Sequence, residues 1–266
     1  MPIWFYTIHP LYCALLLIGT IEFISLAGLF LARRVLLPRL RYGEGTNDAV
    51  SGTVQAIGVF YGITVGLIAI GVWTTYSNAS ELVSREAMAV GAIYRDVSGY
   101  PQPLRSELQS KIREYTVFVI NQAWPAQKIG QSQRLNEGTK LMDDLQAKLY
   151  TFEPNTHGEI ALHSETLKAF NDLIEARNLR IDAVSGGLSS QMWAVIWIGA
   201  IISISVVYFF RIPDLKLHMI LVGLIAGFLA MVLFLIIVND KPFYGYVSVS
   251  AEPYQLILNR VIDGAR

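Results

Sequence analysis

The chain has few charged residues. Aspartate, glutamate, lysine and arginine make up 16% of its 266 residues, whereas soluble domains average about 25%. Hydrophobic residues make up 53% of the sequence. This composition excludes an ordinary water-soluble domain and is typical of an integral membrane protein.

The chain also lacks an excess of basic residues and a second cysteine. The chain has 21 lysines and arginines against 21 aspartates and glutamates, so it lacks the basic balance of a nucleic-acid-binding protein. Its one cysteine, Cys13, excludes an intrachain disulfide and a cysteine-based metal site. We therefore expect the lipid bilayer, and no nucleic acid, as a partner.

Catalytic signatures are missing as well. The sequence has no phosphate-binding Walker loop, no Gly-x-Ser-x-Gly elbow and no His-Glu-x-x-His motif. The histidines are scattered, and His157 and His163 do not have the spacing of metal ligands on a helix. The sequence thus predicts no enzyme, no cofactor and no metal site.

Long apolar runs, in contrast, are present. Residues 54–76 include no charged residue, and as a helix these 23 positions would extend about 35 Å, enough to cross a bilayer. Three more long apolar runs cover residues 10–32, 192–210 and 217–238, and the first of them contains one acidic residue. The predicted fold class is an all-α integral membrane protein with four transmembrane helices.

The polar stretch between the second and third runs shows helical periodicity. The second helix is expected to continue to about residue 97, followed by helices over residues 104–123, 133–152 and 159–185. Trp124-Pro125 is expected to end the first of these three. Four amphipathic helices with short connections predict a four-helix extramembrane bundle of about 110 residues, inserted between transmembrane helices 2 and 3.

These elements predict four segments of the chain. Residues 1–76 would hold transmembrane helices 1 and 2, residues 77–190 the helical domain and residues 191–239 transmembrane helices 3 and 4. Residues 240–266 would form a tail with a short amphipathic segment over residues 253–262.

The second run contains a stripe of small residues. Gly58, Gly62 and Gly66 lie four apart, so on a helix they form a smooth surface that another backbone can approach closely. The neighbouring faces carry larger side chains: Phe60, Thr64, Leu67 and Thr74. One interpretation is a packing helix within a membrane bundle. The other is a pore-lining helix whose stripe lets identical copies pack around an axis.

Glu22 is the one acidic residue within the first apolar run. A carboxyl at bilayer depth is costly, which makes it a candidate for ion or proton handling. The alternative is a neutral carboxyl that is hydrogen-bonded across the helix interface to Thr20, Ser25, Thr64 or a backbone carbonyl.

Charge near the membrane ends favours one orientation. Six basic residues lie in the two short links, against five near the opposite membrane ends. The six in the links are Arg33, Arg34, Arg39, Arg41, Arg211 and Lys216. Because basic residues concentrate on the cytoplasmic side, this pattern places the helical bundle and both termini outside the cytoplasm. We expect the membrane to be a bacterial inner membrane.

Several short motifs resemble one family. They are spread over nearly the whole chain: Asn47-Asp48, Glu86-Ala87, Tyr115, Trp124-Pro125, Arg177, Arg180 and Asp240-x-Pro242-Phe243-x-Gly245. Together they resemble the bestrophin-like family of bacterial and plant membrane proteins.

This resemblance implies a function that the residues alone do not indicate. Bestrophins are pentameric anion channels whose second helix lines a hydrophobic neck, so the likeness implies a homo-oligomer that passes small anions such as chloride. It assigns Phe60, Ile63, Thr64 and Leu67 to the neck. Bestrophins carry a run of acidic residues after Pro-Phe-Gly that helps to bind calcium, whereas this chain has Tyr246-Val-Ser-Val-Ser250 there. Their termini are cytoplasmic, opposite to the orientation that the charges favour.

A second hypothesis comes from a different class of protein. The helical bundle could bind a ligand or partner in a non-conducting sensor, with helices 2 and 3 carrying the signal. A pore that is formed by one helix per chain needs about four or more copies, whereas a sensor can work as a dimer.

Overall fold

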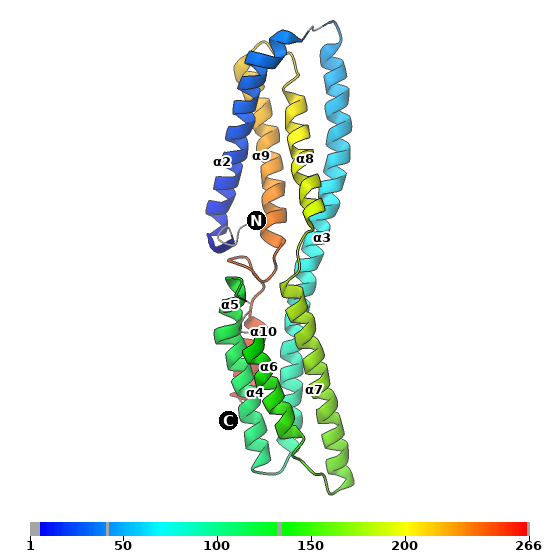
Figure 1. Cartoon of the computed structure of the whole chain (residues 1–266), viewed down its shortest axis with the longest axis vertical. Helices are drawn as coiled ribbons and strands as arrows, with labels where there is room; N and C mark the ends of the chain where they lie inside the picture. The colour runs from blue at the N-terminus through cyan, green and yellow to red at the C-terminus, as the bar shows by residue number, and fades with distance from the viewer. Residues whose placement is uncertain (1–5, 41–42, 132–134, 265–266) are drawn as a thin grey trace. The chain divides into compact units, whose positions relative to one another are not determined.

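The computed structural model describes residues 6–40, 43–131 and 135–264. These residues form helices and connecting turns without any strand. Four of the helices are long and apolar enough to cross a membrane (Figure 1). They are α2 (Pro10–Leu31), α3 (Thr46–Asp96), α8 (Ser190–Val207) and α9 (Leu215–Asn239). The predicted all-α class with four candidate membrane helices is confirmed.

Local capping decides where these helices begin. Pro10 occupies the first turn of α2, where its missing N–H is not needed. The Ser189 hydroxyl accepts from the Met192 N–H, and the Asp214 carboxylate accepts from the Lys216 N–H at 2.8 Å. Helices α8 and α9 therefore begin two residues before the predicted positions.

The chain divides into two compact units. The first, which we call the membrane unit, comprises residues 8–74 and 187–240 and contains α2, the first part of α3, α8 and α9. The second, which we call the bundle unit, comprises the described residues of 2–7, 75–186 and 241–266. Arg41 of the predicted basic link and Gln133 at the predicted start of the third bundle helix lie outside the described residues.

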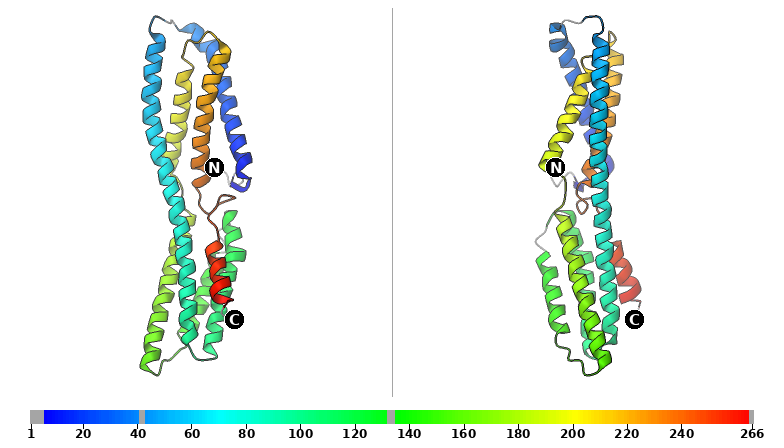
Figure 2. Two further views of the ribbon diagram at one scale, coloured as in Figure 1. Left: turned by 180° about the vertical axis from the view of Figure 1, so that it is seen from behind. Right: turned by 90° about the vertical axis from the view of Figure 1, so that its right-hand side faces the viewer.

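Within the membrane unit, α9 packs beside α2 and α8 (Figures 1 and 2). One face of α3 packs against α8 and α9 through Tyr61, Val65 and Val72, each at most 8% exposed. The Tyr61 hydroxyl donates to the Ile196 carbonyl at 2.9 Å, and its ring lies against Gly199, where a Cβ would collide with it. The buried face of α3 is thus fixed by packing and by one hydrogen bond.

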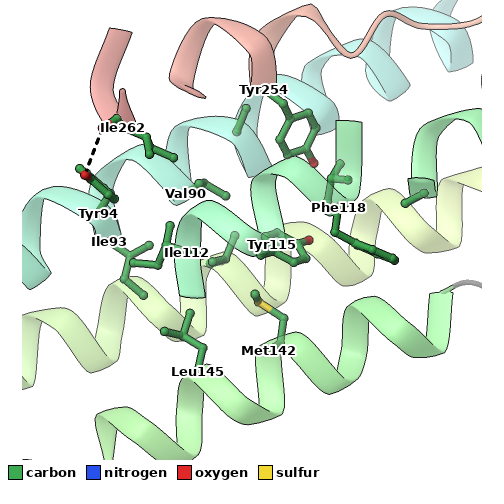
Figure 3. Packing of buried hydrophobic residues seen from close by; sticks show 14 of the residues in the cluster. Val90, Ile93, Tyr94, Ile112, Tyr115, Phe118, Met142, Leu145, Tyr254 and Ile262 are labelled. Atoms are coloured by element: carbon green, nitrogen blue, oxygen red, sulfur yellow. Dashed lines mark hydrogen bonds between the residues drawn. The ribbon is translucent and has the colours of Figure 1, made fainter. Parts of the chain in front are cut away.

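The bundle unit is built from the second part of α3 and five further helices. These are α4 (Leu104–Phe118), α5 (Trp124–Lys128), α6 (Leu135–Leu149), α7 (His157–Val184) and α10 (Glu252–Ile257). Figure 3 shows side chains from α3, α4, α6 and α10 meeting in its core. Residues that recur at helical spacing in the sequence are buried in this core: Leu108, Ile112, Tyr115, Val119, Leu145, Leu149 and Phe170.

The prediction that Trp124-Pro125 ends a helix is wrong. The chain stays helical through this dipeptide: α4 continues into a π-helical turn over Val119–Ala123 and then into α5. Pro125 lies in the first turn of α5, where a missing N–H is tolerated. The wider turn before the proline lets the helix continue without the hydrogen bond that proline cannot make.

The backbone conformation at position 245 requires glycine. Its φ of 73° lies in the left-handed region, and a Cβ on this residue would collide with the Tyr6 carbonyl. The Gly245 N–H donates to the Lys128 carbonyl and the Tyr246 N–H donates to the Tyr6 carbonyl, each at 2.9 Å. Two segments of the bundle unit are therefore joined at this turn.

We expect Gly245→Ala to lower the free energy of unfolding by about 1–3 kcal/mol, because alanine is strained at this φ. Thermal unfolding in detergent, followed by circular dichroism, measures the change. Gly52→Ala is the matched control, since nothing lies within 4 Å of a Cβ there. Equal midpoints for wild type and Gly245→Ala would contradict the expectation.

Candidate functional site

The outward face of α3 within the membrane unit is apolar. Phe60, Ile63 and Leu67 are 74%, 58% and 65% exposed, whereas Tyr61 and Val65 on the packed face are buried. At 100° per residue, Phe60, Ile63 and Leu67 point away from the face that packs on α8 and α9. The part of α3 from Val54 to Tyr76 presents no charge on any face.

The two threonines predicted for the pore-lining set are satisfied within their own helix. The Thr64 hydroxyl donates to the Phe60 carbonyl at 2.8 Å, and the Thr74 hydroxyl donates to the Ile70 carbonyl at 2.9 Å. Thr64 is half-buried and Thr74 is exposed. Each hydroxyl oxygen can still accept a hydrogen bond from water or another chain.

The glycine stripe lies uncovered in the single chain. Gly58, Gly62 and Gly66 are exposed, and a Cβ added to any of them would meet nothing within 4 Å. By helical rotation the stripe lies on one flank of the exposed face and Thr64 lies on the other. A neighbouring helix could therefore approach the backbone of α3 along the flank that carries the glycine stripe.

Glu22 lies on α2 against α9. Its Oε1 would be 2.7 Å from a Cβ on Gly227, so the carboxylate rests directly on the backbone of α9. The hydroxyls of Thr20, Ser25 and Thr64 donate instead to the carbonyls of Leu16, Ile21 and Phe60 on their own helices. None of these three predicted partners donates to Glu22.

The bundle unit contains a buried ion pair that the sequence analysis did not predict. Arg180 on α7 and Glu86 on α3 lie 2.5 Å apart, Nε to Oε2, and their side chains are 2% and 0% exposed. A second contact, Nη2 to Oε1, measures 3.4 Å. Because both charges are out of water, each is stabilised mainly by the other.

Two tyrosines lie beside the ion pair. The Tyr115 hydroxyl donates to Glu86 Oε1 at 2.5 Å, and Tyr254 reaches into the same core from α10 (Figure 3). Burial raises the pKa of Tyr115 and of Tyr254 well above 10, and the negative charge of Glu86 raises both further. Burial alone would lower the pKa of Arg180, but the adjacent Glu86 carboxylate raises it.

Trp124 completes a buried cluster with Glu86, Arg180, Tyr115 and Tyr254. The Arg180 guanidinium lies 5.6 Å from the centre of the Trp124 ring, and Gln127 Oε1 accepts from Arg180 Nη1 at 3.3 Å. The Trp124 ring packs edge-on against Phe243 and Tyr254, and its Nε1–H donates to the Val249 carbonyl at 3.1 Å. The cluster therefore joins α3, α4, α5, α7 and the C-terminal segment.

Polar side chains also join the ends of the membrane unit. Asn47 exchanges two hydrogen bonds with the backbone of Arg211, at 3.2 and 2.9 Å, and so connects the start of α3 to the turn between α8 and α9. The buried Asp240 carboxylate accepts from the Leu188 N–H at 2.6 Å, which connects the end of α9 to the start of α8.

Comparison with known proteins identifies the family of this chain. The sequence model of the bestrophin-like domain family matches residues 20–254. The chain belongs to the bestrophin-like family. A crystal structure of a membrane protein also has this fold, with a TM-score of 0.64 and 8% sequence identity over 94% of this chain and 96% of that chain. A search of curated proteins gave no match.

Most of the motifs that resemble the bestrophin-like family lie at these contacts. Glu86, Tyr115, Trp124, Arg180 and Phe243 meet in the buried cluster. Asn47 and Asp240 form the polar contacts at the ends of the membrane unit, and Gly245 forms the turn with positive φ. The short motifs identified these positions in the sequence, but nothing in the sequence indicated that Glu86 pairs with Arg180, 94 residues away.

We expect Arg180→Met to lower the free energy of unfolding by about 3–5 kcal/mol, because it leaves the Glu86 carboxylate buried without its counter-ion. The double variant Glu86→Gln/Arg180→Met should recover part of this loss. The measurement is thermal unfolding of both variants, with Arg85→Met at the exposed Arg85–Glu175 pair as control. A loss with Arg180→Met no larger than the control's would contradict this account.

Because Tyr115 and Tyr254 are buried, we expect the free energy of unfolding to fall at alkaline pH. Their folded-state pKa values exceed the ordinary 10.0, so above that pH the folded chain keeps protons that the unfolded chain releases. Their contribution to the free energy of unfolding is fully present below about pH 10 and is lost as the pH rises further. Unfolding measured between pH 8 and 11.5 should show a shallower decline for Tyr115→Phe than for wild type; identical slopes would count against a buried, neutral Tyr115.

Proposed function

We propose that the chain assembles into a homo-oligomeric membrane channel whose path for small ions is lined by α3. The observation that carries this proposal is the outward face of α3, on which Phe60, Ile63 and Leu67 are exposed beside an uncovered glycine stripe. A helix that faces only lipid gains nothing from a bare backbone, whereas small residues are enriched where membrane helices meet. Membership of the bestrophin-like family supports a channel.

The constriction is assigned to the large side chains of this face. Rings of Phe60, Ile63 and Leu67 from several copies would form an apolar neck, which passes or blocks ions according to whether water wets it. The oxygens of Thr64 and Thr74 would offer polar positions along the same path. Because this face carries no charge, the preference for small anions such as chloride, and the pentameric ring, rest on the family alone.

We also propose that the bundle unit lies in water, as an extramembrane domain inserted between transmembrane helices 2 and 3. Its described helices α4, α6 and α7 carry many charged residues, and none of them is apolar and long enough to span a bilayer. The buried Glu86–Arg180 pair would give this domain a fixed internal packing. The charges of the links favour an extracytoplasmic location for it.

We expect Leu67→Ala and Phe60→Ala to raise the ionic current at least about twofold, because each shortens an apolar side chain at the neck and eases wetting. Currents through planar bilayers with a salt gradient measure both conductance and sign preference. Leu15→Ala is the control, since Leu15 is 60% exposed on α2, away from this face. Currents unchanged in both α3 variants would remove the neck assignment.

The glycine stripe predicts the assembly state. Gly62→Leu should lower the stoichiometry of the complex, because its side chain would separate the helices that the stripe brings together. Native mass spectrometry of the detergent-solubilised chain gives the number of copies, and Gly19→Leu, at an open position on α2, is the control. An unchanged stoichiometry would place the subunit contact elsewhere.

A non-conducting sensor is the alternative. The Glu86–Arg180 pair joins α3 to α7, so a ligand of the bundle unit could act on both helices. Folded protein that passes no current across pH and calcium concentrations would favour this function, particularly if the chain were dimeric.

A further inference from the structure

A groove of about 360 Å³ runs between α2 and α9 in the membrane unit. Its walls are apolar and come from Ile18, Ile220, Leu224, Phe228 and Met231. Glu22 is the one ionisable side chain that lines it. The groove thus combines a volume typical of a small-ligand site with a single carboxylate.

The carboxylate lies near the middle of the membrane-spanning segments. Glu22 is nine residues, or about 14 Å of helix, from the last residue of α2. Gly227, on which Glu22 rests, is the central residue of the 25-residue helix α9. Water and lipid headgroups are therefore distant from this part of the groove.

The part of the chain that the structure describes provides no partner for this carboxylate. Among the described residues, no donor lies within hydrogen-bonding or ion-pairing distance of Glu22. The nearest hydroxyls on α2 donate to the carbonyls of Leu16 and Ile21. Ionisable groups at this depth normally face a partner or a water-filled cavity, so an unmatched carboxylate in an apolar groove suggests an external partner.

The two properties of the groove define the chemistry of that partner. Lipid acyl chains would fill the apolar walls but offer no donor to the carboxylate, and an inorganic cation would match the charge but leave the walls uncovered. We propose that the α2–α9 groove binds a membrane-dissolved amine: a molecule with an apolar body and a protonated amino group that pairs with Glu22. This site is separate from the outward face of α3 and does not depend on ion conduction.

Gly227 makes this placement of the carboxylate possible. A Cβ at residue 227 would lie 2.7 Å from Glu22 Oε1, so any larger residue displaces the carboxylate from the floor of the groove. Gly227→Leu should therefore remove the site while the Glu22 side chain remains.

The test uses a dodecylamine that carries a photoreactive diazirine on its alkyl chain. The purified full-length chain is labelled in detergent and the modified peptides are mapped by mass spectrometry. We expect labels on α2 around Glu22 and on α9 around Gly227. Unlabelled dodecylamine should compete for labelling, whereas dodecanol should not.

Two variants separate charge pairing from apolar binding. Glu22→Gln keeps the size of the side chain but removes its charge, and it should lower specific labelling about tenfold or more, the effect of losing one charge-assisted contact. Gly19→Leu, at an open position on α2, should label as wild type does. Circular dichroism and size-exclusion chromatography confirm that each variant is folded.

Three results would overturn the proposal. Equal competition by dodecanol, or unchanged labelling of Glu22→Gln, would mean that the groove takes any alkyl chain. Absence of label from both helices in folded wild-type protein would mean that the groove is covered, for example by a second copy of the chain. None of these results bears on whether α3 lines a pore.

Discussion

Hydrocarbon offers no hydrogen bonds, and this constraint shapes the membrane unit. Every backbone group in a spanning segment must find its partner inside the protein, so these segments are helical. The same rule extends to side chains: the hydroxyls of Thr20, Ser25, Thr64 and Thr74 each donate to a carbonyl one turn back on their own helix. Glu22 departs from this rule, as does the buried Ser203 hydroxyl on α8, and Glu22 is the one of the two that lines a groove.

Much of the fold could be predicted from the sequence because apolar length and helical period are local signals. They located α2, α8 and α9 to within about three residues at each end and identified the buried faces of α4, α6 and α7. Helix α3 begins at Thr46, eight residues before the apolar run that predicted it. The error at Trp124-Pro125 has a local cause as well. A π-helical turn over Val119–Ala123 precedes the proline, and no sequence pattern indicates such a turn.

The contacts between distant residues could not be predicted in this way. Glu86 and Arg180 are each ordinary charged residues on amphipathic helices, and only the packed bundle brings them together out of water. The glycine stripe was visible in the sequence, but the structure was needed to show that it is uncovered in one chain. Resemblance to the bestrophin-like family identified several of these positions without assigning them a physical role.

The two units thus differ in how far one chain completes them. The helices of the bundle unit are joined by buried polar contacts, whereas the outward face of α3 in the membrane unit stays exposed in a single chain. In the bundle unit, Glu86 and Arg180 pair with each other, the Tyr115 hydroxyl donates to Glu86, and the Trp124 ring lies against the Arg180 guanidinium. In the membrane unit, α3 presents exposed apolar side chains and bare backbone that a single copy does not cover. A ring of identical copies around α3 would cover the glycine stripe and leave an uncharged path at the centre.

The most direct test of that path is the accessibility of Leu67 to water during conduction. In a Cys13→Ser background, which removes the one native thiol, Leu67→Cys would be exposed to a charged, water-soluble thiol reagent while current is recorded. If α3 lines the path, the reagent changes the current promptly, and Leu15→Cys on α2 does not respond. A Leu67→Cys channel that conducts but ignores the reagent would contradict the account.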